Sequence, residues 1–142
     1  MAGDWTNKAE ITSERAQKAI SFGDRMAAIV NGESSQSFVD ALGPLVDPAR
    51  FRRRGNERTE WDWPAYIAML GQWNQADGKY EKTLHRASEA GNVVYLDLDE
   101  RSTHRDGSVS ALRSISIYEF DEADRIVGVD VIMGFHNAAP IG

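Results

Sequence analysis

The chain has 142 residues, a formal net charge of −6 and no cysteine. A single domain over residues 1–142 could bury about two-thirds of its unfolded surface, and the lack of cysteine excludes disulfides, thiolate catalysis and Cys-ligated zinc. The negative charge argues against a nucleic-acid partner. Because the sequence has neither an apolar run of membrane-spanning length nor a visible signal peptide, we expect no membrane contact and a cytoplasmic location.

Three helices are expected after a frayed terminus at residues 1–12. Apolar residues recur at helical spacing over residues 12–32, 34–42 and 62–77. Each segment begins beside Ser, Thr or Asp, which cap helix starts, and each is followed by glycine, which commonly ends helices. The short segment at residues 50–54 reads as a strand, and a polar loop follows it.

After Gly78 the apolar residues alternate with polar ones instead of recurring at helical spacing, which predicts four strands joined by hairpin turns. Hairpin-linked neighbours are antiparallel. Helices that precede a long meander indicate an α+β domain with its helices on one face of the sheet. The expected long strands are residues 79–88, 93–104, 108–120 and 125–133, followed by a C-terminal tail at residues 135–142.

Side-chain alternation leaves two registers open for the strand at residues 108–120. One face carries isoleucines and the other carries serines and a tyrosine, so the turn before the strand decides which face meets the helices. A two-residue turn places the isoleucines inside, whereas a three-residue loop ending at Gly107 places the serines inside. The two sets are Ile115 and Ile117 on one face, and Ser114, Ser116 and Tyr118 on the other.

The order of these elements resembles the nuclear-transport-factor-2-like (SnoaL-like, ketosteroid-isomerase-like) superfamily. Three segments are similar to the family in order and spacing: the end of the first helix at residues 29–33, the approach to the first strand at residues 45–51, and the last hairpin at residues 117–127. The resemblance covers roughly residues 13–135. It implies a cone-shaped curved antiparallel sheet, or α+β barrel, packed by three N-terminal helices around a mostly apolar pocket. It also implies the register with the serines inside and a homodimer through the outer sheet face.

Residue matching does not reproduce two of the family's reactions. The ketosteroid isomerase base falls at Arg53 and the acidic donor at Ser116, so that isomerisation is not expected. Of the carboxylate–arginine–carboxylate set of limonene epoxide hydrolases, only a carboxylate at Glu100 remains. The resemblance favours a cofactor-independent isomerase, cyclase, dehydratase or hydrolase acting on a small apolar or aromatic molecule. The alternative is a non-catalytic ligand-binding or dimerisation domain. No metal is expected, since no metal-ligand spacing is present.

Four side chains are candidates for catalysis, and each has an ordinary alternative. Glu100 could act as acid or base, or could form a salt bridge with Arg113 or Arg53. Tyr118 could donate to an oxyanion or simply pack in the core. Arg53 could bind an anionic group, and His85 could be a base or an ordinary exposed strand residue. The candidate ligand-binding wall consists of Phe51, Tyr66, Trp73, Leu98, Leu112, Ser114, Ser116, Val129, Val131 and Met133.

Overall fold

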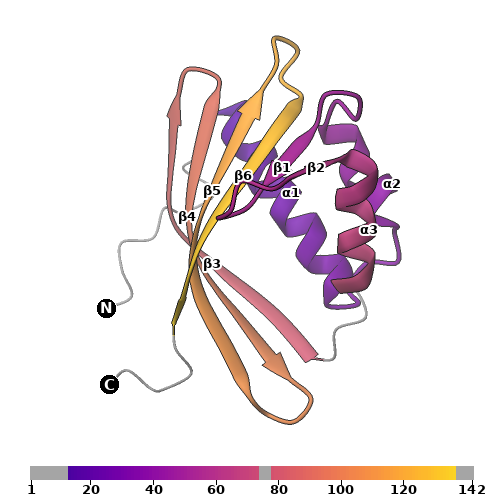
Figure 1. Cartoon of the computed structure of the whole chain (residues 1–142), viewed down its shortest axis with the longest axis vertical. Helices are drawn as coiled ribbons and strands as arrows, with labels where there is room; N and C mark the ends of the chain where they lie inside the picture. Colours follow the sequence, from indigo (N-terminus) through magenta and orange to yellow (C-terminus); the bar gives the residue numbers. More distant parts are fainter. Residues whose placement is uncertain (1–12, 74–77, 137–142) are drawn as a thin grey trace.

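The computed structural model describes residues 13–73 and 78–136, so the expected frayed N-terminus and most of the expected tail lie outside the described residues. Over these residues three helices lie against one face of a six-stranded sheet (Figure 1). No helix among them is long and apolar enough to cross a membrane. The elements are α1 (Glu14–Val30), α2 (Phe38–Leu42), a short 3-10 turn η2 (Gly43–Leu45), β1 (Arg52–Arg54), β2 (Glu60–Asp62), α3 (Trp63–Trp73), β3 (Gly78–Ala90), β4 (Val93–His104), β5 (Val109–Phe120) and β6 (Ile126–His136).

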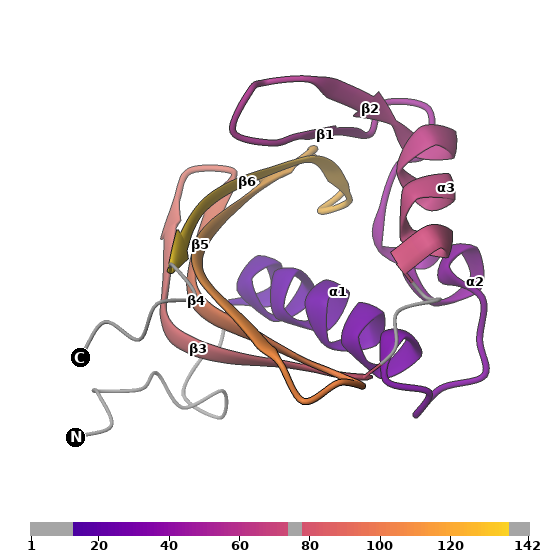
Figure 2. The ribbon, with the colours of Figure 1, turned by 60° about the horizontal axis from the view of Figure 1, so that its bottom comes forward.

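The sheet is strongly curved, and α1 lies within its concave side while α2 and α3 flank it (Figure 2). The α+β cone is confirmed. The strand order β2-β1-β6-β5-β4-β3 leaves the sheet open at both ends rather than closed into a barrel. The sheet is also mixed, because β1 runs parallel to β6. Antiparallel pairing follows only for strands joined by a hairpin, and a helix and four strands separate β1 from β6 in the chain.

The element boundaries follow the expected capping residues with small shifts. Ser13 and Asp62 each accept a backbone N–H in the first turn of α1 and α3. The second helix begins later than expected, because Ser37 is its N-cap. The expected polar loop after β1 ends in a further strand, β2, in which Glu60 pairs with Arg54. At the other end, β6 includes the first residues of the expected C-terminal tail.

The loop between β4 and β5 settles the register of β5. The His104 N–H donates to the Ser108 carbonyl at 2.9 Å, and Gly107 between them has φ of +86°. This is the three-residue loop, and glycine adopts its left-handed conformation without strain. The loop therefore turns the serine face of β5 toward the helices. The buried inward set is Ser114, Ser116, Tyr118 and Phe120, and the outward set is Arg113, Ile115, Ile117 and Glu119.

An aromatic cluster joins α1 to the sheet. The Phe22 ring lies 6.5 Å from the Phe51 ring, 6.3 Å from Tyr66 and 5.7 Å from Tyr118, measured between centroids. Phe51 is fully buried and also packs edge-on against Trp63 at 5.1 Å. Phe51 is therefore a core residue rather than part of an open pocket wall, because the surrounding rings enclose it.

Asn31, the C-cap of α1, fixes the helix to β3. Its side-chain amide donates to the Tyr80 carbonyl at 2.7 Å, and its side-chain oxygen accepts the Tyr80 N–H at 2.8 Å. Asn31 thus pairs with Tyr80 as a neighbouring strand residue would. The contact holds the start of β3 against the end of α1 and fixes the backbone of an inward-facing tyrosine.

The role of Phe51 is testable by substitution. We expect Phe51→Leu to lower the free energy of unfolding by about 1–3 kcal/mol, because it removes ring contacts that the core cannot replace. Urea denaturation followed by circular dichroism measures the change. Val39→Ala is the control, since Val39 is 48% exposed on α2, and it should change stability by less than about 0.5 kcal/mol. Equal effects of the two substitutions would contradict the core assignment.

Candidate functional site

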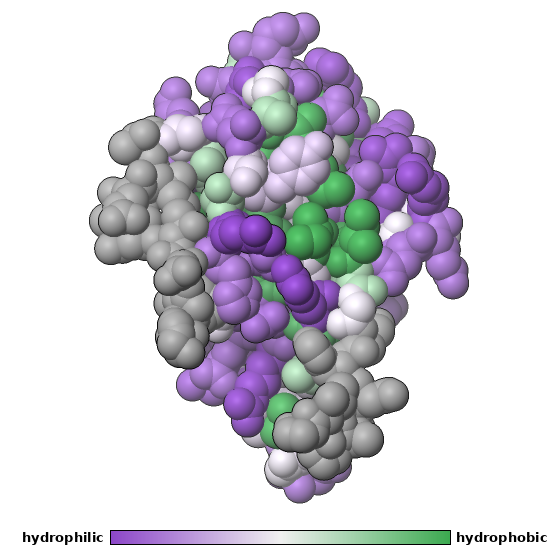
Figure 3. Space-filling model, turned by 90° about the vertical axis from the view of Figure 1, so that its left-hand side faces the viewer, coloured by the Kyte–Doolittle hydropathy of each residue, from purple (hydrophilic) through white to green (hydrophobic). Residues whose placement is uncertain are grey.

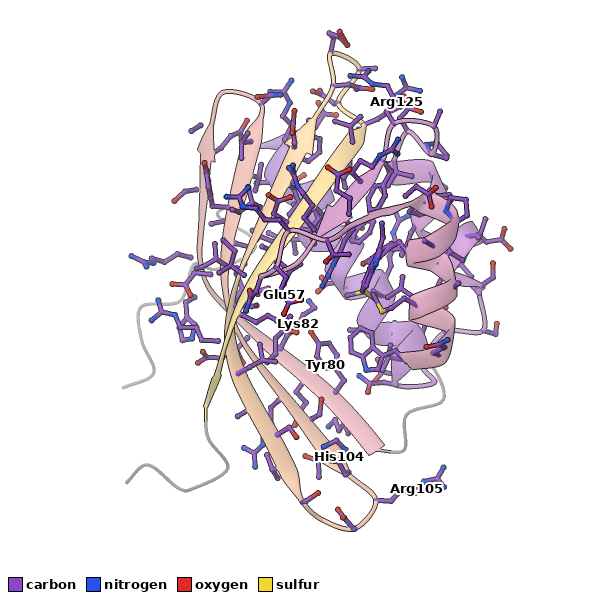
Figure 4. All side chains as sticks on the ribbon, in the orientation of Figure 1. Glu57, Tyr80, Lys82, His104, Arg105 and Arg125 are labelled. Carbon is purple, nitrogen blue, oxygen red and sulfur yellow. The ribbon has the colours of Figure 1, made fainter. Side chains whose placement is uncertain are left out.

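A partly open cavity of about 340 Å³ lies between the concave face of the sheet and the helices α1 and α3. Most of its wall is apolar, and its polar groups come from β1, α3, β3, β4 and β5. Figure 4 shows Tyr80 and Lys82 projecting from β3 into the space between sheet and helices. The arrangement is that of a ligand site, in which a few polar groups converge within an apolar pocket.

Most side chains expected at a ligand site line this cavity. Two expected wall residues do not: Phe51 lies in the core, and Ser114 is fully buried and does not line the cavity. The residues that line it are Arg53, Glu100 and Tyr118 from the candidate catalytic set, and Tyr66, Trp73, Leu98, Leu112, Ser116, Val129, Val131 and Met133 from the candidate wall.

His85, the fourth catalytic candidate, does not line the cavity. The pairing of β3 with β4 shifts register between Leu84 and Arg86, so His85 has no paired residue on β4. Its Nε2 lies 2.7 Å from a carboxylate oxygen of Asp99. The bulge directs the imidazole to this contact, and sequence alternation alone could not show it.

Glu100 is held at the cavity wall by two hydroxyl groups. Tyr80 donates to Oε1 at 2.5 Å, and Ser114 donates to Oε2 at 2.5 Å. Each carboxylate oxygen has two lone pairs, so each can still accept a hydrogen bond or a proton from a ligand. The two contacts fix the orientation of the carboxylate from β3 on one side and from β5 on the other.

Neither salt bridge considered for Glu100 is formed among the described residues. Arg113 lies on the outer face, where its guanidinium contacts Asp97 at 3.0 Å. Arg53 lines the cavity but makes no ion pair with a described side chain. The carboxylate of Glu100 and the guanidinium of Arg53 are therefore two separate charged groups in one cavity.

The cavity also contains phenol groups that remain protonated. Burial raises the pKa of Tyr66, Tyr80 and Tyr118 above the ordinary value near 10. The charge of Glu100 raises each of these pKa values further. The Tyr118 hydroxyl lines the cavity and makes no hydrogen bond with a described residue, so it is available as a donor to a ligand.

Arg53 is positioned by stacking rather than by a counter-ion. Its Cζ lies 5.2 Å from the ring centroid of Trp61 on the neighbouring strand β2. Its Nε is buried and has no hydrogen-bond partner among the described residues. Arg53 thus points inward, as expected, and lines the cavity. Its guanidinium has no counter-ion among the described residues.

Sequence reasoning missed several polar residues of the cavity. Tyr80 and Lys82 line it, and Lys82 is paired with Glu100 across the β3–β4 ladder and forms an ion pair with Asp24. His104 lines it near the end of β4. Strand alternation could have identified two of these residues. Tyr80 and Lys82 lie on the same face of β3, and the hairpin pairs them with inward-facing residues of β4.

Across residues 13–73 and 78–136, the structure contains no group of three or more His, Cys, Asp or Glu side chains placed to hold an ion.

The sequence matches no family model and no curated protein. Solved structures do match it. An LEH-like epoxide hydrolase of M. tuberculosis is 12% identical with a TM-score of 0.61, over 84% of each chain. A nuclear-transport-factor-2-like protein of unknown function from Exiguobacterium is 16% identical with a TM-score of 0.63, over 80% of this chain and 98% of the other.

A third structure is IdmH of Streptomyces antibioticus, which is proposed to be a polyketide cyclase. It is 13% identical with a TM-score of 0.65, over 85% of this chain and 92% of the other. Identities this low establish the fold alone, because one fold hosts many activities. The chain has the nuclear-transport-factor-2-like (SnoaL-like) fold that the order of its elements indicated.

Proposed function

We propose that the cavity binds a small, largely apolar carbonyl compound and that Glu100 transfers a proton on it while Tyr118 polarises the carbonyl. The observation that carries this proposal is the carboxylate of Glu100, fixed by Tyr80 and Ser114 in a cavity that also contains the unpartnered phenol of Tyr118. Isomerisation, cyclisation and dehydration next to a carbonyl group can all begin with such a proton transfer.

The proposed step begins with a C–H bond next to the ligand's carbonyl group. Glu100 accepts the proton, and the electron pair of the broken bond delocalises onto the carbonyl oxygen as an enolate. Tyr118 donates a hydrogen bond to that oxygen, where negative charge develops. Glu100 then returns a proton to the same or another carbon. Tyr80 and Ser114 act as positioning residues, because they touch Glu100 and not the reacting atoms.

The residues at other family positions support this assignment of roles. Arg53 and Ser116 stand at the ketosteroid isomerase positions, and neither a guanidinium nor an alcohol can serve as the base. By resemblance to the family, two further positions of the epoxide hydrolase set fall near Leu98 and Val131, which are apolar. Glu100 is the carboxylate among the described residues that line the cavity between the sheet and the helices α1 and α3, so it is the proposed base.

The structural neighbours support the same general class. They include an epoxide hydrolase and a proposed polyketide cyclase. Both act, or are proposed to act, on small organic molecules. These likenesses support a small-molecule ligand for this chain and leave the reaction to be decided by its own residues.

The proposed proton transfer can be measured without knowing the natural substrate. We expect the protein to accelerate exchange of the α-protons of 2-tetralone, an apolar bicyclic ketone, for deuterium in D2O. Glu100→Gln preserves size and should lower the catalysed rate by about 10²–10⁴-fold, and Tyr118→Phe by about 10²–10³-fold. Proton NMR follows the loss of the α-proton signals.

Glu122→Gln is the matched control, because Glu122 is an exposed carboxylate in the β5–β6 turn. It should exchange at the wild-type rate. A wild-type exchange rate in folded Glu100→Gln would exclude Glu100 as the base. Loss of exchange in Glu122→Gln would show that the catalysis depends on general charge rather than on the cavity.

A second role, dimerisation, is proposed for the outer sheet face. Four apolar side chains are cross-strand neighbours there: Tyr95 lies opposite Ile117, and Ile115 lies opposite Ile132. Ile132 is 52% exposed and Tyr95 is 40% exposed. Figure 3 shows hydrophobic side chains gathered among hydrophilic ones on this face, away from the helices. Charged groups beside the patch are already paired, as in the contact of Asp130 with Arg54 at 2.9 Å.

We expect a homodimer at micromolar concentration, because burial of this patch would remove apolar surface from water. Sedimentation velocity measures the mass. Ile132→Asp should produce a monomer, whereas Val39→Asp, an equally exposed site on α2, should leave the dimer intact. A wild-type monomer at all concentrations, or dissociation by the α2 substitution, would argue against this interface.

A further inference from the structure

We propose that the natural ligand of the cavity is an acid, namely an apolar, ring-containing molecule whose carboxylate is bound by Arg53. This inference rests on the function proposed above and narrows its substrate class. It is carried by a guanidinium that lines the cavity without a counter-ion, while the carboxylates around the cavity already have donors.

Arg53 differs from its neighbours on β1. Among the described residues, Arg54 pairs with Asp130 and Glu60, at 2.9 and 3.8 Å. Arg52 donates to the Phe51 carbonyl at 2.6 Å. Arg53 alone of the three contacts no described acceptor, and its Nε is buried. The guanidinium of Arg53 therefore carries its charge without an acceptor, and a carboxylate brought by a ligand into the cavity could accept from its terminal N–H groups.

The carboxylates around the cavity are already engaged. Glu100 accepts from Tyr80 and Ser114, and Asp24 forms an ion pair with Lys82. Rearrangement of either toward Arg53 would break contacts that the structure has formed. A ligand is therefore a better source of a counter-ion for the Arg53 guanidinium than the described side chains are.

The geometry of Arg53 suits a planar oxyanion. A guanidinium offers parallel N–H groups that bind both oxygens of a carboxylate. Stacking on Trp61, with Cζ 5.2 Å from the ring centroid, orients the guanidinium plane. Arg53 is paired with Val129 across the β1–β6 ladder, and the apolar wall begins there with Val129, Val131 and Tyr66. That wall would hold the ring system.

The opposite charges of Arg53 and Glu100 also orient the ligand. Burial raises the pKa of Tyr66 and Tyr118, the charge of Arg53 opposes this rise, and the charge of Glu100 adds to it. Both phenols are therefore within electrostatic range of both charged groups. A ligand carboxylate is attracted to Arg53 and repelled by Glu100, so the reacting carbon of the same molecule is directed toward Glu100.

The test compares two probes of one shape: 2-naphthoate, which is anionic at pH 7, and 2-naphthamide, which is neutral. We expect isothermal titration calorimetry to give tighter binding of the acid to the wild-type protein. Arg53→Gln should weaken 2-naphthoate binding by about 10- to 100-fold, as loss of charge-assisted hydrogen bonds does, and should leave 2-naphthamide binding within about twofold. Arg52→Gln is the matched control, since this exposed neighbour does not line the cavity.

The outcomes separate this inference from the function on which it rests. Equal binding of acid and amide, or unchanged acid binding by Arg53→Gln, overturns the acid ligand while leaving an apolar-ligand site in place. An equal loss in Arg52→Gln also overturns it, because the effect would then be one of general charge. Failure of both naphthalene probes and of 2-tetralone to bind overturns the proposed function as well. Circular dichroism confirms that each variant is folded.

Discussion

The pairing of β5 with β4 places Ser114 opposite Leu98 and Leu112 opposite Glu100 on the concave face of the sheet. The candidate site depends on this pairing. A shift of one residue would turn the isoleucines of β5 inward and the phenol of Tyr118 outward. The small serine side chains leave space beneath α1 that isoleucines would fill. The same shift would remove the Ser114 hydroxyl, one of the two that orient the Glu100 carboxylate.

The rest of the site is fixed by contacts between the helices and the sheet. Asn31 at the end of α1 binds the backbone of Tyr80 through two hydrogen bonds, and the Tyr80 hydroxyl then binds Glu100. Helix packing is thereby connected to the orientation of one carboxylate. On the other side, Trp61 of β2 supports Arg53. The cation of Arg53 and the carboxylate of Glu100 line one apolar cavity without forming an ion pair, which leaves both available to a ligand.

Local sequence patterns predicted the helices and the four long strands, and the family resemblance selected the register that turns most of the cavity wall inward. Residues 93–104 were expected as a strand, and β4 has those bounds. The parallel pairing of β1 with β6 could not be predicted, because it joins segments far apart in the chain. Phe51 has the expected inward direction, but whether an inward residue meets a cavity or other rings depends on helix packing. The position of His85 depends on a bulge that alternation does not reveal.

The central claim is that the cavity between sheet and helices is the ligand site. Three of the chain's four methionines test it directly, because Met26, Met69 and Met133 line the cavity from α1, α3 and β6. With 13C-methyl-methionine labelling, NMR signals can be assigned by single Met→Leu substitutions and followed as 2-tetralone is added. We expect saturable chemical-shift changes at all three cavity methionines with one dissociation constant. Saturable binding detected by calorimetry with these three signals unchanged would contradict it.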